Sequence, residues 1–340
     1  MQPSTRSVAR SRRFNVDRRP RAPFQLGFQP SLKSVQAPTD GRPRMLSMRV
    51  GIVDVGSNTV RLLVSAWSAD GPVPIREERA YLGLGKEIQR LGWVSEEKVA
   101  ETVRFAATYA ALAREAGADL VEVLVTAPGR QSGNAEEFVR ALAAATRASV
   151  RVLSADEEGR LAFEGALAGA TRPAETVAVC DVGGGSTEVV VGTPAGGPVW
   201  SHSVDIGCVR LTERFLGDDP PTPDALVAAR AEIRAHFDGF TPPLPLAALA
   251  TGGTARALRK LVGKRLGPEE LAQVLRRLRK ASSPEVAKRY DVDPSRARTL
   301  AAGALILSEA AFRLGVPFEV ARSGLREGAA LALLRRAIAA

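Results

Sequence analysis

Two segments of the chain share a pattern of residues that could bind phosphate. Asp54 is followed by Val-Gly-Ser-Asn-Thr, and Asp181 is followed by Val-Gly-Gly-Gly-Ser-Thr. In each segment an apolar β-branched run ends at the aspartate, and a second apolar run follows the small residues. Backbone N–H groups can converge on an anion where no Cβ obstructs them, and the aspartate can bind a cation. We therefore expect two phosphate-binding turns that face one polyanionic ligand across a cleft.

Two other interpretations of these turns are open. A glycine-rich turn also occurs in dinucleotide-binding folds, but there it leads from a strand into a helix, whereas both turns here run into further apolar strand. Two ordinary hairpins would explain Gly183 to Gly185, but they would not explain an aspartate at the same place in both copies.

Further small and basic residues are predicted to complete the phosphate site. Arg130 offers a planar, permanently charged fork, although it could also be a surface residue beside a helix. Gly252, Gly253 and Thr254 form a third small-residue turn. The full set of predicted phosphate contacts is Ser57, Asn58, Thr59, Arg130, Gly183, Gly184, Gly185, Ser186, Thr187, Gly252, Gly253 and Thr254.

Hydrolysis of a phosphoanhydride also needs charge neutralisation and an activated water. We expect a divalent cation, Mg²⁺ above all, held by Asp181 and secondarily by Asp54, which could otherwise only cap their turns. Ser154 and Glu157 have capping-box spacing, which gives Glu157 a structural role and leaves Glu158 without one. On its own, Glu158 could equally be a solvated glutamate in the first turn of a helix. Glu188, which follows the second turn, is a candidate second carboxylate near the water or the metal.

Seven motifs in order resemble the exopolyphosphatase/guanosine pentaphosphate phosphohydrolase (Ppx/GppA) family, from about residue 48 to the C-terminus. The resemblance implies a two-lobed α/β fold of the actin, Hsp70 and sugar-kinase type (ribonuclease H-like), with the active site in a cleft between lobes. It also places the catalytic glutamate before Gly159, at Glu158. The motifs are Asp54–Thr59, Thr126–Asn134, Ser154–Leu161, Asp181–Glu188, Asp205–Thr212, Thr251–Thr254 and Ser323–Gly328.

The function that the resemblance implies is release of terminal orthophosphate from inorganic polyphosphate. The same chemistry would convert guanosine pentaphosphate to the tetraphosphate. A non-catalytic sensor of polyphosphate or of the guanosine nucleotide, and an ATP-dependent kinase, are rivals from other classes. Retention of Glu158, Glu188 and both turns argues against the sensor.

Composition limits the other possibilities. Residues 1–47 hold ten basic and two acidic residues and so carry +8 of the formal charge of +10, which leaves about +2 for the rest. Nucleic-acid binding by this nearly neutral part is therefore not expected. No apolar run reaches transmembrane length, and Cys180 and Cys208 suggest neither a disulfide framework nor a metal site, so we expect a cytoplasmic protein. Whether it forms a homodimer is open.

The expected domain organisation has three parts. Residues 1–47 form a disordered basic extension that could be a tail, a targeting segment or the result of start-site choice, since Met45 and Met48 directly precede the first strand. Residues 48–172 form lobe I, with strands at 49–55, 59–67, 73–81, 120–126 and 150–153 and helices at 95–115 and 134–147 and after Ser154. Residues 173–340 form lobe II, with paired strands around Asp181, strands at 199–205 and 246–250, a helix at 223–238, and a last helix, 324–338, packed near the hinge.

Overall fold

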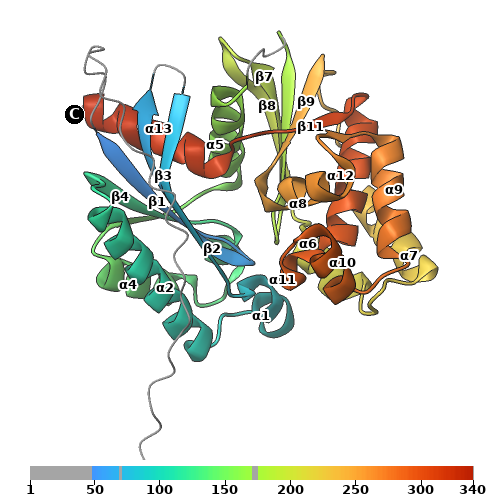
Figure 1. Cartoon of the computed structure of the whole chain (residues 1–340), viewed down its shortest axis with the longest axis horizontal. Helices are drawn as coiled ribbons and strands as arrows, with labels where there is room; N and C mark the ends of the chain where they lie inside the picture. Colours follow the sequence, from blue (N-terminus) through green and yellow to red (C-terminus); the bar gives the residue numbers. More distant parts are fainter. Residues whose placement is uncertain (1–47, 69–70, 171–174, 340) are drawn as a thin grey trace, which may run out of the picture. The chain divides into compact units, whose positions relative to one another are not determined.

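The computed structural model describes residues 48–68, 71–170 and 175–339, all of which belong to one compact unit (Figure 1). The expected disorder of residues 1–47 lies outside the described residues. Within the described ranges, no helix combines the length and the apolar character that a membrane span requires.

The first sheet has five strands in the order β3-β2-β1-β4-β5. β1 pairs antiparallel with β2 and parallel with β4, and β4 pairs parallel with β5. Both faces of β1 are buried, which explains why its sequence is a continuous apolar run rather than an alternating one. The strands are β1 (Arg49–Val55), β2 (Thr59–Ser68), β3 (Gly71–Tyr81), β4 (Leu120–Val125) and β5 (Ser149–Val152).

The second sheet repeats this arrangement in the order β10-β11-β9-β6-β7-β8. β6 pairs antiparallel with β7 and parallel with β9, just as β1 pairs with β2 and β4. Two sheets that share the 3-2-1-4-5 order of strands form the two-lobed α/β fold that was predicted. The strands are β6 (Val177–Val182), β7 (Thr187–Thr193), β8 (Gly197–Val204), β9 (Ala247–Thr251), β10 (Arg265–Leu266) and β11 (Phe318–Val320).

Two helices cross between the sheets, α5 (Ala155–Ala168) and α13 (Leu325–Ala339). Helix α5 follows the first sheet in sequence but packs Phe163 and Ala166 against β6 and β7, and α13 packs against β1. The helices meet at glycines: a Cβ on Gly165 would lie 1.9 Å from the Gly324 carbonyl oxygen. Figure 1 shows α5 and α13 side by side between the two sheets.

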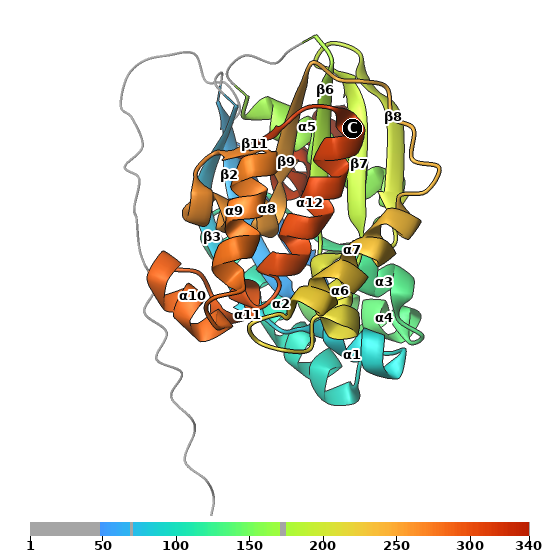
Figure 2. The same ribbon diagram turned by 90° about the vertical axis from the view of Figure 1, so that its right-hand side faces the viewer.

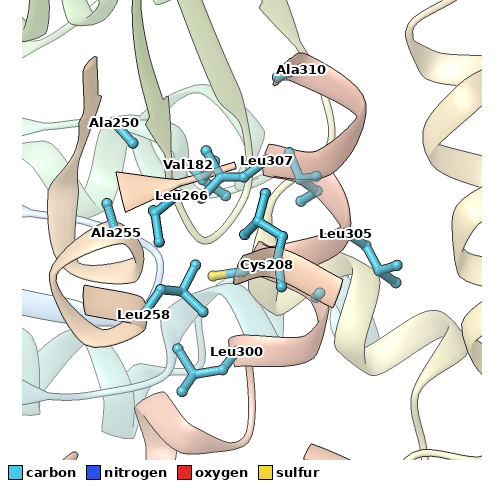
Figure 3. Packing of buried hydrophobic residues seen from close by; sticks show 14 of the residues in the cluster. Val182, Cys208, Ala250, Ala255, Leu258, Leu266, Leu300, Leu305, Leu307 and Ala310 are labelled. Carbon is cyan, nitrogen blue, oxygen red and sulfur yellow. The ribbon is translucent and has the colours of Figure 1, made fainter. Parts of the chain in front are cut away.

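Several of the remaining helices cover the outer faces of the sheets. α2 and α4 pack on the first sheet, and α7, α8, α9 and α12 surround the core of the second (Figure 2). In that core, Leu300, Leu305 and Leu307 of α12 pack near Cys208 and Leu258 (Figure 3). The helices are α1 (Leu84–Leu91), α2 (Glu96–Glu115), α3 (Ala127–Gln131), α4 (Ala135–Thr146), α6 (Cys208–Phe215), α7 (Pro223–His236), α8 (Gly252–Val262), α9 (Pro268–Leu278), α10 (Ser283–Tyr290), α11 (Pro294–Ala297) and α12 (Leu300–Leu314).

Most expected elements are found within a few residues of their predicted bounds, and several are additional, among them α1, α3, α6, β10 and β11. Helices α1 and α3 were not expected because α1 lies between the turn-forming Gly83 and Gly92 and α3 is a single short turn that contains Pro128. Strand β11 was not expected because three residues carry too little periodicity to be recognised.

Candidate functional site

The two glycine turns have the same geometry and touch each other. Each joins two antiparallel strands, and the N–H of Gly56 donates to the Thr59 carbonyl as the N–H of Gly183 donates to the Ser186 carbonyl, both at 3.0 Å. A Cβ on Gly184 would lie only 2.8 Å from Ser57 Cβ. Glycine is therefore needed where the second turn approaches the first, and the two turns form one surface.

A small pocket of about 80 Å³ lies where the turns meet. The N-terminus of α8, the aspartates that end β1 and β6, and Glu158 complete its wall. A helix N-terminus with free N–H groups favours an anion. The predicted site residues that line the pocket are Asp54, Ser57, Asn58, Thr59, Glu158, Asp181, Gly183, Gly184, Gly185, Ser186, Gly252 and Gly253.

Two aspartates, Asp54 and Asp181, line this pocket. Burial raises the pKa of Asp181 to about 6, with a further contribution from the charge of Asp54, while Arg256 and Arg61 lower it. Burial also raises the pKa of Asp54, against the lowering effect of Arg61. The N-terminal residue of α8, Gly252, has φ of +81°, and a Cβ there would lie 2.3 Å from Asp181 Oδ1. The space beside Asp181 thus depends on glycine.

Glu158 projects from the first turn of α5. Ser154 and Glu157 form the predicted capping box, with Glu157 exchanging hydrogen bonds with Ser154, which leaves the buried Glu158 free of that task. A Cβ on Gly159 would lie 2.9 Å from Val190 Cγ2, so the glycine allows α5 to approach β7. Burial raises the pKa of Glu158 to about 7, although Arg130 lowers it.

Arg130 joins the two glutamates rather than standing free. It donates from Nη1 to Glu158 Oε2 at 2.8 Å and to the Leu153 carbonyl at 2.8 Å, and from Nη2 to Ser186 Oγ at 3.3 Å. Its Nη2 lies 3.8 Å from Glu188 Oε1. Helix α3 can place Arg130 there because Gly129 packs tightly, with a hypothetical Cβ only 2.8 Å from Val152 Cγ1.

Glu188 lies behind the pocket, directly across the β6–β7 pair from Asp181. It is 2 % exposed, and it accepts from Ser203 Oγ at 3.1 Å. Its Oε2 has no hydrogen-bond partner among the described residues. Burial, followed by the charge of Glu158, raises the pKa of Glu188 well above its ordinary value. Glu158 and Glu188 thus form a pair of buried carboxyls that cannot both ionise cheaply.

Thr187 and Thr254, both predicted to contact phosphate, lie outside this pocket. Thr187 Oγ1 donates to the Ile206 carbonyl at 2.7 Å, and Thr254 Oγ1 donates to the Val182 carbonyl at 3.0 Å. Both side chains are fully buried. Their hydroxyls therefore support the backbone around the pocket rather than face a ligand.

The main feature that the sequence did not predict is a group of arginines at the pocket. Arg61 occupies the position that Glu188 holds in the second sheet, directly across from Asp54. Burial lowers the pKa of Arg61 to about 9, and the charges of Arg326, Arg256 and Arg296 lower it further. These arginines are far apart in the sequence and come together only in the folded protein. Its members are Arg61, Arg256, Arg296 and Arg326.

Some of these arginines belong to patterns that the sequence shows, and others do not. Arg326 and Glu327 belong to the last of the seven motifs, and Arg61 stands out as the charge difference between the two turns. Arg296, on the short helix α11, has no local signal and reaches Thr254 Oγ1 at 3.2 Å from 42 residues away.

Comparisons with known proteins identify the family of this chain. Residues 63–337 match the model of the Ppx/GppA phosphatase family. The chain is similar to exopolyphosphatase 2 of Mycobacterium tuberculosis, with 31% identity over 79% of this chain and 92% of that protein. It is also similar to exopolyphosphatase 1 of Mycobacterium leprae, with 27% identity over 83% of this chain and 88% of that protein.

A solved structure shows the same fold. The Ppx/GppA family member of Aquifex aeolicus superimposes with a TM-score of 0.73 and 28% identity, covering 85% of this chain and 98% of that one. The chain therefore belongs to the Ppx/GppA phosphatase family and is a phosphatase of the hydrolase class.

Proposed function

We propose that this phosphatase releases the terminal orthophosphate from inorganic polyphosphate. The observation that carries the proposal is the pocket of about 80 Å³, into which two glycine turns, a helix N-terminus and buried arginines converge on Glu158. Pockets for drug-sized ligands span roughly 300–1,000 Å³, so this one suits a single phosphate group. A site that encloses one phosphate supports removal of end groups rather than cleavage within a chain.

Glu158 is the proposed general base. Because its pKa is raised to about 7, roughly half of it is deprotonated at neutral pH, which is the condition for efficient proton transfer. Glu188 is its partner in a coupled titration, and we assign the more acidic step to Glu158 because Arg130 lies 2.8 Å from Glu158 but 3.8 Å from Glu188. Glu158 takes the proton from the attacking water, while burial and the charge of Glu158 raise the pKa of Glu188 and so favour its neutral form.

The backbone and the arginines bind the substrate. The N–H groups of Gly184, Gly185 and the α8 N-terminus would donate to phosphate oxygens, while the Gly183 N–H closes the turn by donating to the Ser186 carbonyl. The buried arginines add charge in a water-poor site, where it stabilises the developing negative charge more strongly than in water.

The pocket also fits a divalent cation, which we propose is Mg²⁺. Mg²⁺ is usually held by one or two carboxylates together with substrate phosphates and waters, and Asp181 and Asp54 are two enclosed carboxylates on one pocket. Among the described residues no group of three or more His, Cys, Asp or Glu forms a closed metal site. When bound, the cation would neutralise phosphate oxygens, and the two aspartates would hold it.

A phosphate-release assay tests the proposal. The protein is incubated with polyphosphate of several lengths and, separately, with guanosine pentaphosphate, with Mg²⁺ present in both. We expect release from polyphosphate at the higher kcat/KM. Release from the guanosine nucleotide alone would replace the polyphosphate assignment, and release from neither would refute the proposed function.

A further inference from the structure

A second, larger cavity adjoins the phosphate pocket. It measures about 710 Å³ and shares Arg61, Arg256, Arg326 and Glu327 with the small pocket. Its other walls come from β2 and β3, from the end of α5 and from the segment before α13. The small pocket has the size of one phosphate group, and this cavity has room for several more.

Two arginines lie side by side on the wall of the cavity that β2 and β3 form. Arg61 and Arg79 are direct cross-strand partners, an arrangement that destabilises a strand pair. Among the residues that the structure describes, no hydrogen bond or ion pair joins either arginine to a carboxylate. Arg79 lies over the Tyr81 ring at 5.1 Å. The wall therefore presents positive charge that lacks an anionic partner.

Polar atoms on the same wall also lack partners. Arg61, Leu63 and Ser65 alternate along β2 and line the cavity together. Ser65 is 1 % exposed, yet its Oγ has no hydrogen-bond partner in the described part of the chain, and neither has Arg61 Nε. Buried polar groups are normally satisfied, so two orphaned donors on one wall indicate a ligand that accepts hydrogen bonds.

The three glutamates of the cavity already have partners, whereas four of its five arginines have no hydrogen bond or ion pair to a carboxylate within the described part of the chain. Arg76 binds Glu78 at 2.9 Å, Arg326 binds Glu77 at 2.8 Å, and Glu327 accepts from the Gly324 N–H at 2.8 Å. Five arginines line the cavity against these three glutamates. They are Arg61, Arg79, Arg256, Arg322 and Arg326.

We propose that this cavity is a subsite for the part of the substrate that stays behind when the terminal phosphate leaves, with Ser65, Arg79 and Arg322 as its specificity-determining residues. The inference rests on the proposed function. The occupant is the linear phosphate chain, whose negative charge at every unit matches the arginines of the cavity and whose oxygens accept from Ser65 and Arg61. Among the described residues, Arg326 is the one cavity arginine that is paired with a carboxylate. A nucleotide offers fewer charges in the same space.

The test uses the double variant Arg79→Gln/Arg322→Gln in the full chain, with Arg140→Gln as the matched control. All three arginines are exposed, so the variants should fold, and Arg140 on α4 lines neither cavity. kcat and KM are measured for tripolyphosphate, long-chain polyphosphate and guanosine pentaphosphate. For the double variant we expect KM for long-chain polyphosphate to rise about tenfold, the worth of two partly exposed charges.

The comparison between substrates decides the outcome. The subsite predicts that the rise in KM is several times larger for the long chain than for tripolyphosphate and that it shrinks at high salt, because exposed charges are screened. A KM for the long chain equal to that of the Arg140→Gln control would overturn the subsite while leaving the proposed function intact. A rise confined to guanosine pentaphosphate would assign the cavity to a nucleotide instead. A wild-type protein inactive on polyphosphate would remove the proposed function itself.

Discussion

Replacing Arg130 with Gln should shift the pH dependence of hydrolysis rather than abolish activity at every pH. Arg130 Nη1 lies 2.8 Å from Glu158 Oε2, and it lowers the pKa of Glu158 against the effect of burial. A neighbouring arginine typically lowers the pKa of a carboxyl by about 1–3. We take the low end because the Arg130 side chain is 21% exposed.

The expected magnitude follows from the protonation of Glu158. With a pKa of about 7, about half of Glu158 is ionised at pH 7, and a pKa higher by about one leaves roughly a tenth ionised. The turnover of Arg130→Gln at pH 7 should therefore fall about fivefold and should recover as pH rises toward 9.

The assay is a profile of kcat/KM against pH for wild type, Arg130→Gln and the surface control Arg160→Gln, which loses only an exposed pair with Glu164. The same polyphosphate serves for all three, so the titration of the substrate itself cancels in the comparison. An unmoved acid limb with a uniform loss at all pH values would refute the reasoning and would show that Arg130 acts on phosphate, as its residue type first suggested.

Three further perturbations test other parts of the site. Folding raises the pKa of Glu158 from an ordinary 4.5 to about 7, so the fold is favoured while Glu158 is protonated: this contribution to stability is present in full below about pH 4.5 and is lost as pH rises through 7. Glu158→Gln should therefore raise Tm by a few degrees at pH 8, worth on the order of 2 kcal/mol, and leave Tm unchanged at pH 4. Melting curves equal to those of wild type at both pH values would contradict this. Gly252→Ala places a Cβ 2.3 Å from Asp181 Oδ1 and should cut kcat about 10²-fold through displacement of that carboxylate, whereas normal kcat would show that Asp181 need not hold its position. Excess chelator should abolish phosphate release and Mg²⁺ should restore it, with Asp181→Asn needing more Mg²⁺ than Asp54→Asn; full activity in chelator would refute the metal proposal.

The sequence predicted best those features that depend on local pattern. Each turn, its aspartate and the strands on both sides lie within one short segment, Arg49–Ser68 or Val177–Thr193, so their order alone predicts a hairpin. The capping box of Ser154 and Glu157 is likewise local, and the structure confirms it. These two patterns were sufficient to predict the turns and the position of Glu158 at the start of a helix.

Features that depend on distant contacts could not be read in this way. Arg130 was expected to point at phosphate, but its partners Glu158 and Ser186 are 28 and 56 residues away, and only the fold brings them within hydrogen-bond distance. The packing of α5 against the second sheet rather than the first is equally invisible in its own sequence. It depends on contacts with strands that come later in the chain, such as the close approach of Gly159 to Val190 of β7.

The arginine group shows the same limit. Arg61 on β2, Arg256 on α8 and Arg326 on α13 come from three elements, and no spacing links them. A buried arginine also runs against the expectation that such residues are exposed. Sequence patterns therefore predicted the glycine turns but not the positive charge that surrounds them.

The role of Glu158 as general base is the central claim, and its most direct test is the turnover of Glu158→Gln on polyphosphate beside Glu157→Gln. The two glutamates are neighbours on one helix turn, but Glu157 is held by the capping box and Glu158 by Arg130. We expect kcat for Glu158→Gln to fall by about 10²–10⁴, the usual contribution of a general base, while Glu157→Gln keeps wild-type kcat. Near-normal turnover by Glu158→Gln, with its folding intact, would contradict the account.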